Sequence, residues 1–186
     1  SSKQLTEVAP STVDLLLPSG AENLNYVLYT DESPYKMQRE WLDRLPFDIY
    51  SVNVHTGAKR LIGRSYRTAP KWSVNGKWAV MYDPIAQVWN KFDGATGKVV
   101  NISDAIGYPM FVESYDKPAP APAYGIAGWT ADGNNVFLYD AYDWWKIDLT
   151  GERQPECLTK GYGRKHGKSI RKMTSNIDKD VFQKDE

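Results

Sequence analysis

Short segments of the chain alternate apolar and polar residues. Val80 and Tyr82 occupy alternate positions, and Val136 and Leu138 do the same, so one face of each segment is apolar. This period of two predicts a β-strand around each pair. Amphipathic segments with the helical period are almost absent, which disfavours α/β folds and helical repeats.

The predicted strands belong to a repeated unit. Residues 72–77 read Trp-Ser-Val-Asn-Gly-Lys, and residues 129–134 read Trp-Thr-Ala-Asp-Gly-Asn. Each copy continues into an apolar strand that ends in Tyr-Asp, then into an aromatic strand. Each then reaches an Asp that opens a Gly-containing turn, at 93–98 and 148–152. Two copies in register indicate a repeat fold.

A third copy precedes these two in a degraded form. Residues 25–31 match the Tyr-Asp strand, residues 47–53 match the aromatic strand, and 56–59 form its turn. An insertion, 32–45, separates the two strands. Its core at 35–42 is expected to be a short helix or an ordered loop in a surface excursion.

Each copy predicts a four-stranded antiparallel meander. Asn75-Gly76 and Asp132-Gly133 supply the positive-φ residues of two-residue hairpin turns. The last strands are expected at 98–102 and 156–159. Meanders that repeat at about 40–60 residues build β-propellers. The predicted fold is therefore all-β, a partial β-propeller of about three four-stranded antiparallel blades with flanking segments.

The chain is expected to form one partial propeller domain, 1–186. Its parts are blade copies at about 22–63, 70–103 and 127–159, and a stretch at 163–186 that is a tail or the start of a further blade. The Pro-rich residues 114–124 should cross between blades, since proline removes ladder donors; a domain linker is the alternative.

Three copies are too few for a closed propeller. Closed rings usually contain about four to eight blades. We therefore expect the chain to be a piece of a larger protein. An open stack also leaves its terminal sheets uncovered, so the piece is expected to self-associate.

Composition excludes several classes of function. Lys and Arg number 23, as do Asp and Glu, so a general attraction to nucleic acid or to anionic membranes has no support. No apolar run approaches the roughly 18 residues of a membrane span. Ser1 opens a polar stretch without a leader, so any signal peptide is expected to have been removed or not included.

The sequence offers no catalytic, cofactor or metal site. A single Cys157, expected to be a small buried side chain, excludes a disulfide framework and a Cys-rich zinc site. The only histidines are His55 and His166, and neither lies in a recognisable catalytic motif. Ser169 lacks the following glycine of a nucleophile elbow. The Asp residues at turns are expected to bind local backbone N–H groups rather than calcium.

The run 161–169 is similar to a phosphate-binding loop but departs from it. Tyr162 stands where that loop needs glycine, and no buried parallel strand is expected before it. An ordinary solvated basic loop is the main interpretation of this run. The alternative is an incidental, nonspecific anion-binding site at Arg164, Lys165 and Lys168.

The aromatic residues have two interpretations. They could stack on sugars, but four of them recur at motif positions, as residues that pack blade against blade should: Trp72, Tyr82, Trp129 and Tyr139. Of the neighbours Trp144 and Trp145, one must point to the opposite face from the other.

The motifs together resemble a known kind of blade. The succession Trp-Ser/Thr-x-Asn/Asp-Gly, Tyr-Asp, Asp-x-Trp/Tyr and Asp-x-x-Gly resembles the TolB/dipeptidyl-peptidase type, and in particular the N-terminal propeller of prolyl oligopeptidase family serine peptidases. The resemblance covers about 22–165. Residues 124–148 and 158–164 are especially similar to the large secreted members of Gram-negative gut-type bacteria.

The resemblance implies a function for the parent protein rather than for this chain. In the family, the serine, acid and histidine lie in a C-terminal α/β-hydrolase domain, which is absent here. The chain would restrict peptide access to that domain. Its partners would be the remaining blades, the hydrolase domain and, through the parent enzyme, peptide substrate. The location would be periplasmic or secreted. The family's acidic clamp for a substrate amino terminus matches no motif here. The alternative is a non-enzymatic TolB-like module that binds a protein or a glycan.

Overall fold

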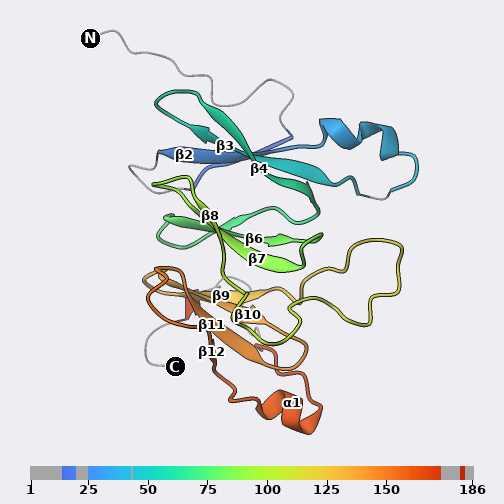
Figure 1. Ribbon diagram of the computed structural model, residues 1–186, viewed down its shortest axis with the longest axis vertical. Coiled ribbons are helices and arrows are strands. Elements are labelled where there is room, and N and C mark those ends of the chain that lie inside the picture. Colours follow the sequence, from blue (N-terminus) through green and yellow to red (C-terminus); the bar gives the residue numbers. More distant parts are fainter. Residues whose placement is uncertain (1–13, 20–24, 43, 173–180, 183–186) are drawn as a thin grey trace.

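The computed structural model describes residues 14–19, 25–42, 44–172 and 181–182. Three β-sheets stack along the long axis of the molecule (Figure 1). We call them blades 1 to 3 in chain order. The stack is open, and the predicted all-β architecture of three four-stranded antiparallel blades is confirmed.

Blade 1 contains four antiparallel strands in the order in which they occur along the chain. These are β1 (Leu15–Leu17), β2 (Tyr26–Asp31), β3 (Phe47–Asn53) and β4 (Lys59–Tyr66). The sequence prediction began this copy at residue 22 and left β1 out. Three consecutive leucines have no alternation of apolar and polar residues, so only pairing with β2 makes them a strand.

Blades 2 and 3 repeat the same strand order. The strands of blade 2 are β5 (Lys71–Trp72), β6 (Trp78–Asp83), β7 (Val88–Asp93) and β8 (Val99–Asn101). Those of blade 3 are β9 (Ile126–Thr130), β10 (Asn135–Tyr139), β11 (Trp144–Asp148) and β12 (Glu156–Cys157). A further strand, β13 (Val181–Phe182), pairs parallel with β9 at the edge of blade 3.

The turns after β5 and β9 differ from the predicted two-residue hairpins. In the first, Ser73 and Trp78 close the turn, so the loop is wider. Gly76 has φ of +66°, as predicted, but Asn75 does not have a positive φ. Asn75 instead accepts a hydrogen bond from the Lys77 N–H at 3.0 Å. The Asn75 side chain therefore helps to close this turn, whereas the sequence predicted that the Asn75 backbone would do so with a positive φ.

The long connections emerge at one end of the strands. The insertion in blade 1 carries the 3-10 helix η1 (Ser33–Gln38), so the structure has the short helix rather than the ordered loop that was the other expectation for this excursion. Residues 114–124 form no ladder strand apart from an isolated bridge between Phe111 and Ala123, as expected of a crossing. The helix α1 (Tyr162–His166) follows blade 3. All three excursions lie on the same side of the stack (Figure 1).

The core lies between the blades, because each sheet buries both faces. The interface of blades 1 and 2 contains the buried residues Leu28, Phe47, Ile49, Tyr66, Ala79, Met81 and Phe92. The interface of blades 2 and 3 is larger and contains Val80, Tyr82, Trp89, Ile106, Met110, Trp129, Val136, Leu138, Trp145, Ile147 and Leu149.

The predicted role in blade packing is confirmed for Trp72, Tyr82 and Trp129, whereas Tyr139 is buried on the other face of blade 3. Tyr82 and Trp129 are buried between blades 2 and 3, and Trp72 packs between blades 1 and 2. Trp145 joins the interface of blades 2 and 3, whereas Trp144 packs on the other face of blade 3. The two neighbouring tryptophans therefore point to opposite faces, as the strand period requires.

Candidate functional site

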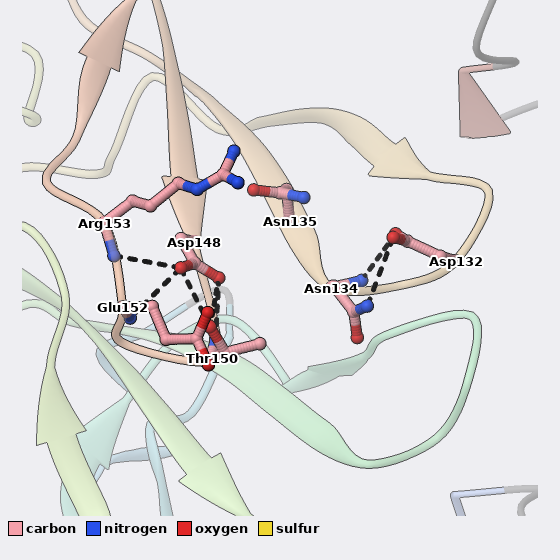
Figure 2. A pocket seen from close by; sticks show the side chains of 7 residues that line it. All are labelled: Asp132, Asn134, Asn135, Asp148, Thr150, Glu152 and Arg153. Atoms are coloured by element: carbon pink, nitrogen blue, oxygen red, sulfur yellow. Dashed lines mark hydrogen bonds between the residues drawn. The ribbon is translucent and has the colours of Figure 1, made fainter.

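A polar hollow lies among the turns of blade 3, on the side away from α1. It encloses about 190 Å³, and Figure 2 shows it between the β9–β10 turn and the β11–β12 turn. Every side chain that lines it is polar or charged: Asp132, Asn134, Asn135, Asp148, Thr150, Glu152 and Arg153.

The Asp132 carboxylate is hydrogen-bonded within its own turn, between β9 and β10. It accepts hydrogen bonds from the Thr130 hydroxyl at 2.5 Å, the Asn134 backbone N–H at 2.9 Å and the Asn134 side-chain amide at 3.1 Å. The Thr130 hydroxyl, followed by the Asn134 N–H, lowers the pKa of the Asp132 carboxyl below its ordinary value.

The Asp148 carboxylate is likewise hydrogen-bonded within its own turn, between β11 and β12. Burial by itself would raise the pKa of the Asp148 carboxyl, but hydrogen bonds from the Thr150 hydroxyl and from three backbone N–H groups lower it. The N–H groups belong to Thr150, Glu152 and Arg153, at 2.9 to 3.1 Å. The prediction that turn aspartates bind local backbone is thus confirmed. Among the described residues, no group of three or more His, Cys, Asp or Glu side chains is placed to hold a metal ion.

A second cluster of charge is buried at the opposite end of blade 3. Asp140 directly follows β10 and is fully buried. One of its oxygens accepts hydrogen bonds from the Trp145 indole at 3.0 Å and from the Arg164 guanidinium at 3.1 Å. The other accepts the backbone N–H groups of Tyr142 and Asp143. Every oxygen of this buried carboxylate is satisfied, as its burial requires.

Asp143 extends the cluster to the chain after blade 3. It accepts hydrogen bonds from the Thr159 hydroxyl at 2.6 Å and from the N–H groups of Gly163 and Arg164 at 2.9 and 3.1 Å. Burial would raise the pKa of the Asp143 carboxyl, but these hydrogen bonds and the Arg164 charge lower it. The two aspartates together fix the start of α1 against the β10–β11 loop.

Arg164 is the cation of this cluster, which corrects the prediction of a solvated basic loop at this residue, whereas Lys165 and Lys168 are exposed as predicted. Its guanidinium lies 3.8 Å from the ring centre of Tyr108 and 5.1 Å from that of Tyr142. Since it lies over the Tyr108 ring, close to the Tyr142 ring, and is paired with Asp140, Arg164 is not part of an open anion site. A side chain at Gly163 would meet the Tyr142 carbonyl oxygen at 2.5 Å, so only glycine allows this close approach.

The structure does not bring the candidate catalytic residue types together. The His55 ring contacts the Asn25 amide at 3.1 Å in blade 1, whereas His166 contacts the Tyr162 carbonyl at 2.9 Å on α1. The Ser169 hydroxyl donates to the Ala141 carbonyl at 2.6 Å. Each of the three groups makes its hydrogen bond to a different partner, and none of these hydrogen bonds joins one of them to another.

Two interpretations of the sequence need revision here. Cys157 is half-buried at the edge of the core rather than buried, and it accepts a hydrogen bond from the Gly161 N–H at 3.3 Å. The Asp140–Arg164 pair was missed, because the two residues lie far apart in the chain. The Asp that ends each Tyr-Asp strand was the available signal, since a short loop follows it in both copies.

Comparison with known proteins reveals a distant likeness. No protein-family model matches the chain, and no curated protein matches it either. Among solved structures it is similar to the β-propeller domain of the Trilobed protease from Pyrococcus furiosus, described as having an open velcro topology. The identity is 14%, the TM-score is 0.37, and the match covers 78% of this chain and 44% of that one. The chain thus spans less than half of its structural neighbour.

Proposed function

We propose that the chain is a non-catalytic propeller segment of a prolyl-oligopeptidase-like serine peptidase. It restricts the access of peptides to a hydrolase domain that lies outside this chain. The observation that carries the proposal is the repeated blade motif, which resembles that family over about 22–165. Its partners are further blades, the hydrolase domain and, through the parent enzyme, short peptides, in the periplasm or outside the cell.

The arrangement of the loops is compatible with this role. The 3-10 helix, the crossing 114–124 and α1 all project on one side, so one rim of the stack is built up while the other has tight turns (Figure 1). Met37 and Trp41 on the insertion are 91% and 82% exposed. Exposed apolar groups on long loops are typical of a surface that contacts another protein part. No helix in the described part of the chain is long and apolar enough to cross a membrane.

The test uses the native protein that carries these blades and the 186-residue chain side by side. Both are treated with a fluorophosphonate, which reacts covalently with activated serines. We expect the native protein to be larger and to be labelled, and the 186-residue chain to stay unlabelled. The native protein should cleave short peptides and leave folded proteins intact. A native polypeptide that ends near Glu186, or one that is not labelled, would contradict the proposal.

The second candidate is a non-enzymatic module that binds a glycan or a protein. The polar hollow of blade 3 favours it, because amide and carboxylate groups suit sugar hydroxyls. Chemical-shift changes confined to Asn134, Asn135 and Thr150 on titration with oligosaccharides would support this candidate.

A further inference from the structure

Blade 3 has a fifth strand that the repeated unit does not supply. β13 lies on the side of β9 that faces away from β10, with Val181 opposite Trp129 and Phe182 opposite Thr130. The first strands of the other blades, β1 and β5, have no such neighbour in the described part of the chain. Since four strands complete each of those blades, β13 is an addition to the edge of blade 3 rather than a part of its meander.

The direction of β13 also sets it apart. It runs parallel to β9, whereas the other ladders between the described strands are antiparallel. A parallel neighbour cannot be joined by a short hairpin, so β13 is a separate segment that adds to the edge of β9. Addition of an extended segment to a sheet edge is a known mode of peptide binding, in which main-chain hydrogen bonds supply the affinity.

The backbone of β9 confines this addition to the end of the strand. The ladder between β9 and β10 shifts at Ala127, which has no partner in β10, and Gly128 beside it has φ of +152°. A bulge with a glycine bends a strand and interrupts pairing along its edge. Among the described residues, the two that pair with β13 are Trp129 and Thr130, directly after the bulge.

The contact between β13 and β9 is short. It consists of two residue pairs, and parallel pairing is slightly less stable per residue than antiparallel pairing. A segment of the same chain can still occupy the edge, because a short tether gives it a local concentration on the order of millimolar. Release of β13 would leave N–H and C=O groups of β9 unpaired, and such an edge accepts another extended segment.

We propose that the end of β9 is a binding site for an extended polypeptide segment, which pairs parallel with Trp129 and Thr130 as the fifth strand of blade 3. In this chain β13 occupies the site, so a separate polypeptide binds only when β13 is released. The segment that binds carries β-branched or aromatic residues, which favour strands, as Val181 and Phe182 do. The proposal does not depend on the peptidase role, because the pairing is measured on this chain alone.

The first measurement tests whether β13 covers the edge of β9. Val181→Pro combined with Phe182→Pro removes both N–H donors of β13. Lys184→Pro combined with Asp185→Pro, which adds as many prolines outside β13, is the matched control. We expect amide hydrogen exchange at the end of β9 to become about fivefold faster or more in the first variant and to stay unchanged in the control. Circular dichroism confirms that each variant is folded, which we expect because the four-stranded meander of blade 3 is unaltered.

The second measurement adds a synthetic peptide with the sequence of residues 178–186 to the isotope-labelled chain. We expect chemical-shift changes at Trp129 and Thr130 in the Val181→Pro/Phe182→Pro variant. The parent chain should bind the peptide about fivefold more weakly or worse, because its edge is free in only a fraction of the molecules. A peptide with the same two prolines should not bind.

Three results would overturn the proposal. They are equal exchange at the end of β9 in the two proline variants, a peptide that does not bind the Val181→Pro/Phe182→Pro variant, and equal binding of the peptide that contains the two prolines.

Discussion

At the scale of the residue, two of the three buried aspartates among the described residues, Asp140 and Asp143, lie next to each other in blade 3, and the third is Asp48 in blade 1. Both carboxylates lie at the loop end of blade 3 and hold Arg164 and the start of α1. A buried carboxylate is stable only with full hydrogen bonding, so the loss of one partner leaves another group unsatisfied. This cluster is best understood as a structural clamp, since the two carboxylates accept hydrogen bonds from the β10–β11 loop, Trp145, Thr159 and the first residues of α1.

Asp140→Asn should destabilise the protein by about 2 kcal/mol, because the replacement keeps the shape but leaves the Arg164 charge without its anion. Urea unfolding measures the change as a shift of the midpoint at constant slope. Asp104→Asn, the same replacement at an exposed position, is the control and should shift the midpoint little. Equal shifts for the two variants would contradict the clamp.

The stability should also depend on pH. The pKa values of Asp132, Asp143 and Asp148 are lower in the folded protein than the ordinary value of 3.8. The stabilisation is therefore present above about pH 4 and is lost as the pH falls through the folded-state pKa values. Urea midpoints at neutral and acidic pH test this, and Asp143→Asn should lessen the drop. A urea midpoint that is the same at acidic and neutral pH would contradict this prediction.

At the scale of the element, the turns of adjacent blades stack on one another. The Asn75 side chain of blade 2 donates to the Asp132 carbonyl of blade 3 at 2.8 Å. Gly133 lies against Asn75, and a side-chain carbon there would approach the Asn75 backbone nitrogen to 2.8 Å. The glycine thus has two reasons to be there, its φ of +68° and this contact.

Gly133→Ala should cost about 1–3 kcal/mol, from the strained backbone and the crowding of Asn75. The matched control is Gly107→Ala, where no atom lies within 4 Å of the added carbon. The control should change the free energy of unfolding by less than about 0.5 kcal/mol. Thermal or urea unfolding of both variants gives the comparison, and a neutral Gly133→Ala would show that the turns do not pack as described.

At the scale of the whole molecule, three blades form an open row in which blade 2 alone contacts both others (Figure 1). In such a row, stability is approximately a sum of the blades and of their interfaces. The interface of blades 2 and 3 contains more buried side chains than that of blades 1 and 2. A substitution that weakens one interface should therefore destabilise the terminal blade at that interface more than the blade at the other end of the row.

Leu138→Ala should destabilise blade 3 by about 2–5 kcal/mol, because Leu138 is fully buried between blades 2 and 3. Hydrogen exchange should then speed up in β10 and β11 more than in β2 and β3. Val52→Ala, which truncates a fully buried side chain of blade 1, should show the reverse pattern. Uniform loss of protection in either variant would mean that the blades unfold as one unit.

The sequence by itself determined the class of fold and most of the strands. Strand period and turn residues are local properties, so the repeat of Trp, Asp-Gly and Tyr-Asp was enough to place β6, β7, β10 and β11. The packing role of Tyr82 and Trp129 also followed, because residues repeated in register face equivalent neighbours.

Only the tertiary structure decided what the charged residues do. Asp140 and Arg164 meet because α1 folds back onto the β10–β11 loop, a contact that no local pattern encodes. The strand β1 exists because β2 offers it an edge, and the loop after β5 is closed by Ser73 and Trp78, with a hydrogen bond to the Asn75 side chain inside it. Local propensity fixes the elements, whereas long-range packing and the satisfaction of buried polar groups fix their partners.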